Sequence, residues 1–476
     1  ACSSSLTAIY MACESIKRGE CQYAVAGGVN LNLHPSKWVG LSNGGMIGTE
    51  GKSQSLGNGE GYVPGEGVGT VLIKPLADAI ADQDHIYGIV KGGHINHGGR
   101  STGFTVPNEE GQITLATAAL KDAGVSADQI DYIETASNGS QVGDPIEMRG
   151  LQQTFKNLNK SIPVGTVKSN IGHCEAASGI SQVTKVLLQY KHHELVPSIN
   201  SEPLNPAIDL NESPFYVQNE IKKIAKAESF NTLINSFGAG GSNAQLVISK
   251  HNDSVKQIAH SNISRLVILS GEDQDALKRI AGNLVGCLNK LAKESTLTMG
   301  QLAYTLQTGR QPLENRMTIV ADALNELSGL LKGFLSGKVD ATKIQLSKEL
   351  IEEESEVTAD TLEMMKEDVE KGDFQSLVAS WLSGGIIDWK VFYRGGFPQK
   401  VSLPTYPFKG ESYWAGELGK IPSASQSQPV SEKVISKVDQ KITSAIEVSG
   451  SNGNGAILNG SHQAALLQEA SVPVID

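Results

Sequence analysis

The chain has 476 residues, of which 39% are hydrophobic and 51 are glycine, and its formal net charge at pH 7 is −11. This composition predicts a globular α/β protein with many tight turns and excludes a disordered or fibrous chain. The acidic balance, without a long Lys/Arg run, argues against nucleic acid or an anionic membrane surface as a partner.

The five cysteines are scattered and form no Cys-x-x-Cys pair, which favours a reducing compartment and predicts a cytoplasmic location. The close histidine pairs, His94 with His97 and His192 with His193, lack a surrounding cysteine or carboxylate pattern, so no metal site is predicted. No apolar run reaches the roughly 18 residues that a membrane span needs, and no signal peptide is seen. Because the chain begins at Ala1 without Met, we expect a C-terminal fragment.

The first 250 residues are predicted to form one unit. Apolar residues at spacings of three and four predict a helix over 6–18. Further helices are expected at 112–123 and from Glu175 to Tyr190, and strands at 23–31, 69–76, 86–93, 130–135 and 162–167. We expect the strand at 86–93 to pair with that at 69–76. Two strands around a glycine-rich turn close the unit at 232–249, and the alternation of helices and strands favours a layered α/β fold.

Four further segments follow this unit. A polar linker is predicted at 251–263 and a smaller α/β flanking domain at 264–390, whose acidic run at 351–371 is expected to be a solvated helical face. A segment rich in proline and aromatic residues, at 391–416, is expected to wrap back onto a folded surface. Beyond it the composition changes to Ser, Gln, Asn and Gly, which predicts a flexible, disordered tail at 417–476.

Cys2 lies immediately before the first predicted helix, in the sequence Ala-Cys-Ser-Ser-Ser. The positive end of a helix dipole favours thiolate over thiol, so Cys2 is a candidate nucleophile. The alternative is a small buried hydrophobic residue, since a free cysteine often serves only that purpose.

Three loops of small residues accompany Cys2, at 134–147, 167–173 and 234–244. Each is weak evidence alone, because glycine-rich turns are common, a lone histidine is often structural and a lone lysine is usually on the surface. Together and in this order they resemble the β-ketoacyl synthase family, and more narrowly the ketosynthase domains of modular polyketide synthases. The matching motifs are CSSS at 2–5, GYVPGEGVG at 61–69, GDPIE at 143–147, KSNIGH at 168–173 and SFGAGGSNA at 236–244.

The resemblance covers about residues 1–250, and LPTYPF at 403–408 is similar to the segment that follows a polyketide ketosynthase. Pro64 in GYVPGEG, where many relatives carry Arg, and an aromatic-rich tail without acyltransferase sequence suggest the trans-acyltransferase subclass. The resemblance implies a thiolase-like layered fold, of which only the second half, starting at the nucleophile helix, is expected here. It implies no cofactor bound by the domain itself. The implied partners are acyl carrier proteins, a second copy in a homodimer and neighbouring polyketide synthase domains.

The same resemblance assigns roles to individual residues. Cys2 would accept an acyl chain as a thioester from the phosphopantetheine of an acyl carrier protein. The backbone N–H groups of Cys2 and Phe237 would form the oxyanion hole, with Gly238 allowing the backbone to approach. His173 would lie beside the thiol. Supporting positions are assigned to Lys168, Asn170, Asp144 and Glu134, and Asp144 is interpreted together with Glu147 as a loop anchor.

The chain departs from the family at one catalytic position. An elongating ketosynthase carries a second histidine in a segment Glu-Ala-His-Gly-Thr-Gly-Thr, whereas this chain has Glu134-Thr-Ala-Ser-Asn-Gly-Ser140, so Ala136 replaces the histidine. No titratable side chain within 135–143 substitutes for it. The hypothesis is a non-elongating ketosynthase that accepts an acyl chain without condensing it. The alternatives are an ordinary elongating synthase, a thiolase or initiation-type synthase, and a catalytically dead docking scaffold.

Overall fold

The computed structural model describes residues 1–411 apart from 104, 157, 226–228, 253–260, 292–296, 352 and 394–395. The predicted tail at 417–476 and most of the predicted linker at 251–263 therefore lie outside the described residues. No helix of the described residues is both long and apolar enough to cross a membrane.

A six-stranded mixed sheet forms the centre of the first 250 residues, in the order β3-β10-β9-β4-β5-β7. β9 and β10 form an antiparallel hairpin, β3 pairs antiparallel with β10, and β4, β5 and β7 run parallel. The strands span Ile89–His97 (β3), Tyr132–Glu134 (β4), Ile162–Gly165 (β5), Phe215–Val217 (β7), Asn231–Phe237 (β9) and Ser242–Ser249 (β10). β4 and β5 are buried along their whole length, as expected of parallel strands covered on both faces.

β1 (Ala24–Asn30) and β2 (Gly67–Ile73) form a separate antiparallel ribbon. The predicted pairing of the strand at 86–93 with that at 69–76 is wrong: β2 pairs with β1, and β3 pairs with β10. The physical reason is that α3 (Leu76–Ala81) ends β2 and the chain then enters a different sheet. Close glycine-to-glycine contact accompanies the true pairing, since a Cβ on Gly27 would lie 2.1 Å from the carbonyl oxygen of Gly69.

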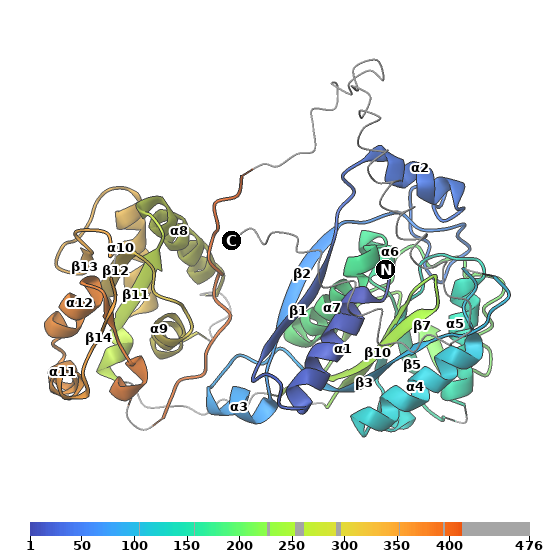
Figure 1. Cartoon of the computed structure of the whole chain (residues 1–476), viewed down its shortest axis with the longest axis horizontal. Helices are drawn as coiled ribbons and strands as arrows, with labels where there is room; N and C mark the ends of the chain where they lie inside the picture. The colour runs from blue at the N-terminus through green and yellow to red at the C-terminus, as the bar shows by residue number, and fades with distance from the viewer. Residues whose placement is uncertain are drawn as a thin grey trace, which may run out of the picture. The chain divides into compact units, whose positions relative to one another are not determined.

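Helices α1 (Ser4–Lys17) and α7 (Ser178–His192) lie between this ribbon and the six-stranded sheet (Figure 1). α1 buries Leu6 and Ile9, and its backbone approaches α7 so closely that a Cβ on Gly179 would lie 2.4 Å from the Leu6 nitrogen. The predicted helix at 175–190 begins at Ser178, because residues 175–177 form a 3-10 turn, η2.

The opposite face of the six-stranded sheet is covered by α4 (Glu109–Ala123) and α5 (Gly143–Thr154). α4 is capped by the side chain of Asn108 and ends at Gly124, which adopts the left-handed conformation with φ 61°. Shorter elements complete this part: α2 (Pro35–Asn43), α6 (Lys168–Ile171), β6 (Glu194–Leu195) and β8 (Lys222–Lys223). The predicted layered α/β arrangement is therefore confirmed.

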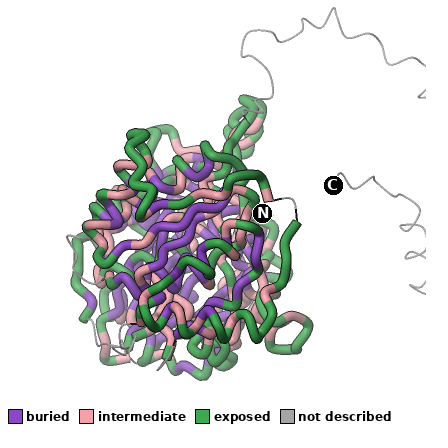
Figure 2. The backbone as a smooth tube through the Cα atoms, turned by 90° about the vertical axis from the view of Figure 1, so that its left-hand side faces the viewer, coloured by how far each residue is buried: buried purple, intermediate pink, exposed green. Residues whose placement is uncertain are grey.

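The described residues from 262 to 411 build a second α/β core around an antiparallel sheet. Its strands are β11 (Leu266–Gly271), β12 (Asn315–Val320) and β13 (Ile344–Leu346), and a two-stranded sheet joins β14 (Ser355–Glu356) to β15 (Gly385–Ile386). Its helices are α8 (Gln274–Leu291), α9 (Met299–Thr308), α10 (Leu324–Leu335), α11 (Ala359–Lys371) and α12 (Gln375–Leu382). α11 is acidic outside, as predicted, but buries Met365 and Val369. Leu403 of LPTYPF packs into this core. Figure 2 shows buried backbone running inside a shell of exposed segments.

Candidate active site

Cys2 lies in the turn that leads into α1, and its backbone is fastened to the β9–β10 hairpin. Its carbonyl oxygen accepts a hydrogen bond from Oγ of Ser236, at 2.9 Å. Oγ of the next residue, Ser3, donates to Oγ of Ser242 at 3.3 Å. Ser236 and Ser242 flank the segment that contains Phe237 and the glycine-rich turn. The structure therefore brings the candidate nucleophile and the candidate oxyanion-hole segment together.

The turn from Gly238 to Gly241 is closed by backbone hydrogen bonds. The Gly241 N–H donates to the Gly238 carbonyl at 2.9 Å, and the Gly238 N–H donates to the Ser242 carbonyl at 2.8 Å. Gly241 has φ 89°, in the region that favours glycine. These contacts hold the end of β9, where Phe237 lies, in a fixed turn.

His173 is almost fully buried, at 2% exposure, and is held by the GYVPGEG segment. Its N–H donates to the Val63 carbonyl at 2.8 Å, and its carbonyl accepts from the Gly65 N–H at 2.9 Å. Gly172, just before it, has φ 77°, and a Cβ there would lie 2.6 Å from the Val63 carbonyl oxygen. The Tyr62 ring packs edge-on against the imidazole, with centroids 4.7 Å apart.

The imidazole of His173 presents Nε2 as a hydrogen-bond donor. The backbone N–H of Glu175 donates to Nδ1 at 3.1 Å, and Oγ of Ser178 lies 2.8 Å from the same atom. A backbone N–H can only donate, so Nδ1 is an acceptor and the neutral ring carries its proton on Nε2. Burial, followed by the positive charges of Lys168 and Lys37, lowers the pKa of His173 well below its ordinary value.

Lys168 is buried, so the surface-lysine alternative does not hold. Its Nζ donates to the carbonyl oxygen of Ala136. Burial lowers the pKa of Lys168, whereas electrostatic interactions with the side chains of Cys2, Glu147 and Asp144 act to raise it. Lys168 therefore binds the loop in which Ala136 replaces the family histidine, and it also interacts electrostatically with Cys2.

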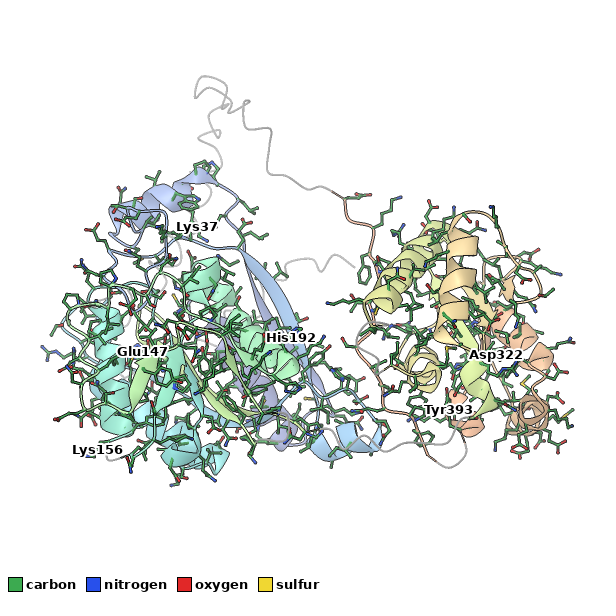
Figure 3. All side chains as sticks on the ribbon, turned by 180° about the vertical axis from the view of Figure 1, so that it is seen from behind. Lys37, Glu147, Lys156, His192, Asp322 and Tyr393 are labelled. Atoms are coloured by element: carbon green, nitrogen blue, oxygen red, sulfur yellow. The ribbon has the colours of Figure 1, made fainter. Side chains whose placement is uncertain are left out.

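Two buried carboxylates fix the loop around Ala136. Glu147 accepts from the Ala136 N–H and from Oγ of Ser137, both at 2.8 Å. Asp144 accepts from the N–H groups of Asn138 and Gly139, at 3.0 and 2.9 Å. Burial raises the pKa of both carboxyl groups. These contacts support their interpretation as loop anchors rather than as an acid–base pair; Glu147 is labelled in Figure 3.

The two remaining supporting positions differ from each other. Glu134 is fully buried and pairs with Lys185 at 2.7 Å, and its other oxygen accepts from the Val167 N–H at 2.6 Å. It therefore anchors the turn just before Lys168. Asn170 is exposed and donates to the Pro197 carbonyl at 3.2 Å, so the contacts that hold His173 come from other residues.

Sequence reasoning missed several residues around His173. Tyr62 belongs to the GYVPGEG motif, which could have indicated it, and Ser178 is the first residue of α7, five positions after the histidine. Ser236 fastens Cys2 from the strand end next to Phe237. Lys37 could not be predicted from the sequence, because nothing local relates it to a histidine 136 positions later.

His97 lies on β3 with its ring near the Gly240 carbonyl. The described residues contain no group of three or more His, Cys, Asp or Glu suited to a metal.

Three family models match the chain in order. They are the β-ketoacyl synthase N-terminal domain at 1–79, the β-ketoacyl synthase C-terminal domain at 87–202 and the ketoacyl-synthetase C-terminal extension at 204–317. The ketosynthase from module 6 of the bacillaene synthase of Bacillus subtilis 168 is 33% identical, with a TM-score of 0.78, over 87% of this chain and 73% of that chain. The chain belongs to the β-ketoacyl synthase family of transferases, with its thiolase-like fold.

Within that family the similarity is to ketosynthase domains of modular polyketide synthases. An oxazolomycin ketosynthase domain of Streptomyces albus is 34% identical, with a TM-score of 0.74, over 87% of this chain and 69% of that one. Polyketide synthase PksL of Bacillus subtilis is 38% identical over 90% of this chain and 10% of the relative. Polyketide synthase ThaG of Burkholderia thailandensis is 35% identical over 87% of this chain and 8% of the relative. The chain spans about a tenth of the length of these curated relatives.

Proposed function

We propose that this ketosynthase accepts an acyl chain on Cys2 and passes it on without extending it. The observation that carries the proposal is Ala136: its backbone is held on both sides, by Glu147 and Lys168, while its methyl group can neither donate nor accept a hydrogen bond. The other parts expected of the site, Cys2, His173 and the turn after Phe237, are all present.

Acyl loading needs only these parts. The Cys2 thiolate attacks the thioester carbonyl of an acyl-phosphopantetheine, forming a C–S bond and a tetrahedral oxyanion. Backbone N–H groups of Cys2 and Phe237 stabilise that oxyanion, and Nε2–H of His173 is available as a further donor. Collapse breaks the original C–S bond, and the departing pantetheine thiolate takes up the proton that Cys2 lost. The reaction consumes no other reagent.

Condensation with a malonyl unit requires further hydrogen-bond donors. Decarboxylation of a malonyl unit generates an enolate oxygen, which two imidazoles normally hold. Removing one preorganised donor of this kind costs about 10²–10³ in rate. In this chain His173 supplies one imidazole and Ala136 supplies none, so the loss falls on carbon–carbon bond formation and spares acyl transfer.

The partners follow from the family. We propose that acyl carrier proteins deliver the acyl chain on phosphopantetheine, that a second copy forms a homodimer and that other polyketide synthase domains are neighbours. Similarity to bacillaene synthase ketosynthases supports the trans-acyltransferase subclass. The predicted domain boundaries at 250 and 264 stay a proposal, since the C-terminal extension model runs across them.

The test supplies the protein with acyl-carrier thioester and malonyl-carrier protein. Intact-protein mass spectrometry should show acylated Cys2, lost in Cys2→Ala, and product analysis should show no two-carbon extension. Robust elongation would disprove the proposal. Absence of acylation, together with unreactive Cys2 towards iodoacetamide, would instead favour a docking scaffold.

An elongating enzyme is the second candidate, because Lys168 places a buried cation against the Ala136 carbonyl. In that case Lys168 would hold the enolate oxygen in place of the missing imidazole. Lys168→Met would then abolish elongation while leaving acylation of Cys2 measurable. Under the first proposal there is no elongation for this variant to lose.

A further inference from the structure

A network of hydrogen bonds that includes one ion pair starts and ends at His173 and connects it to α2 and β1. The Glu175 N–H donates to Nδ1 of His173, and the Glu175 carboxylate pairs with Nζ of Lys37 at 3.2 Å. Lys37 also donates to Oδ1 of Asn30 at 2.9 Å. Nδ2 of Asn30 donates to the Gly65 carbonyl at 2.8 Å, and the Gly65 N–H returns to the carbonyl of His173. Figure 3 labels Lys37.

Glu175 has an unusual backbone within this network. Its φ is 41°, in the left-handed region that a residue with a Cβ adopts only when its surroundings hold it there. That conformation directs its N–H towards Nδ1 of His173. Its carboxylate is attached through Oε2 to Lys37, whereas Oε1 is buried without a hydrogen-bond partner among the described residues.

The ion pair is partly shielded from water. The side chains of Lys37 and Glu175 are 24% and 18% exposed, so their attraction is screened less than at an open surface. Lys37 is also one of the positive charges that disfavour protonation of His173. The same lysine therefore fastens the residue that holds Nδ1 and opposes formation of an imidazolium ion.

We propose that Lys37 and Glu175 are positioning residues for His173: their ion pair holds the left-handed backbone at Glu175, whose N–H keeps Nδ1 an acceptor and Nε2 the proton-bearing donor. The inference rests on the proposed function, in which Nε2–H faces the acyl carbonyl. Neither residue touches the reacting atoms, and both act through the imidazole.

The test compares Lys37→Met, which removes the charge, with Lys37→Arg, which keeps it. Lys52→Met is the matched control, because Lys52 is an exposed lysine of the same part of the chain. The first readout is the rate of Cys2 acylation from an acyl-pantetheine thioester. The second is the ¹⁵N spectrum of the histidine-labelled protein, in which an unprotonated, hydrogen-bonded Nδ1 and a protonated Nε2 are distinguishable.

We expect Lys37→Met to lower the acylation rate about tenfold or more, as misplacement of a catalytic group does. It should also convert the single His173 tautomer signal to an exchanging mixture. Lys37→Arg should restore both, and Lys52→Met should change neither. Glu175→Gln should match Lys37→Met, and the double variant should be no worse than either single one.

A single unchanged tautomer in Lys37→Met would overturn the inference, even if that variant unfolds at a lower temperature, because such a result describes a merely structural ion pair. Equal acylation rates in Lys37→Met and Lys52→Met would overturn it as well. If the unsubstituted protein is not acylated, the proposed function fails, whereas the spectrum still decides whether the ion pair sets the tautomer.

Discussion

The neutral ring of His173 carries its proton on Nε2 because Nδ1 accepts the Glu175 N–H. The sequence predicts it as a site residue from its position in KSNIGH, and predicts Cys2 from the CSSS motif. Its tautomer was not predictable, because that depends on the N–H of Glu175 and hence on one left-handed backbone angle. Lys168 was predicted as a supporting residue, but its partner is the Ala136 carbonyl, which only the folded loop reveals.

The depressed pKa of His173 predicts how stability depends on pH. In the unfolded chain a histidine has a pKa of about 6.5, whereas in the folded protein burial lowers it well below that value. As the pH falls below about 6.5, the unfolded state binds a proton that the folded state does not. This histidine therefore destabilises the fold by up to about 1.4 kcal/mol per pH unit in that window.

His173→Gln removes this contribution. Urea unfolding between pH 7.5 and 5 should show a shallower loss of stability for the variant than for the unsubstituted protein, since all other histidines are common to both. Identical slopes would show that His173 titrates normally in the folded state.

Asp144 is expected to be essential for the fold and only indirectly for chemistry. It accepts three backbone hydrogen bonds, from Leu56, Asn138 and Gly139. Asp144→Ala leaves these donors without their partner, at about 1–3 kcal/mol each. We expect at least about 3 kcal/mol of destabilisation by chemical denaturation, or failure to fold. Asp128→Ala, at an exposed position, is the control and should change stability little.

At the scale of elements, α1, α4, α7 and most strands of the first 250 residues were predicted, whereas α5 and the true partners of β2 and β3 were not. Apolar periodicity located α1, which buries Leu6 and Ile9 on one face. β2 and β3 are both apolar and successive, which favoured pairing them. Their separation into two sheets depends on how the chain turns through α3, and residue spacing carries no information on that turn.

Replacing glycine by alanine should change the stability of the protein in opposite directions at Gly172 and Gly286. Gly172 has φ 77° and approaches the Val63 carbonyl, so Gly172→Ala should destabilise the protein by about 2 kcal/mol or more and slow Cys2 acylation. Gly286 lies inside α8 with open space around it, so Gly286→Ala should stabilise by roughly 0.5–1 kcal/mol. Chemical denaturation of both variants measures the contrast. Equal effects would contradict the close approach at Gly172.

At the scale of the whole molecule, the layered fold followed from the motifs and the alternation of elements. The structure adds which side chains of the β1–β2 ribbon face solvent. β1 and β2 pack one face on α1 and α7, while the other face presents large apolar side chains to solvent. Val68 is 74% exposed and Leu72 67% exposed, and Val25 and Val29 extend the same apolar ribbon.

This exposed ribbon predicts concentration-dependent association of the 476-residue chain, because contiguous apolar surface of this kind is rarely left uncovered in a soluble monomer. Val68→Glu combined with Leu72→Glu should weaken the association, since a charge would have to be desolvated in the contact. Val339→Glu, at an exposed position outside the ribbon, should leave it unchanged. Sedimentation equilibrium over a range of concentrations measures the effect. A chain that stays monomeric at every concentration would contradict the prediction that the exposed face of β1 and β2 drives association.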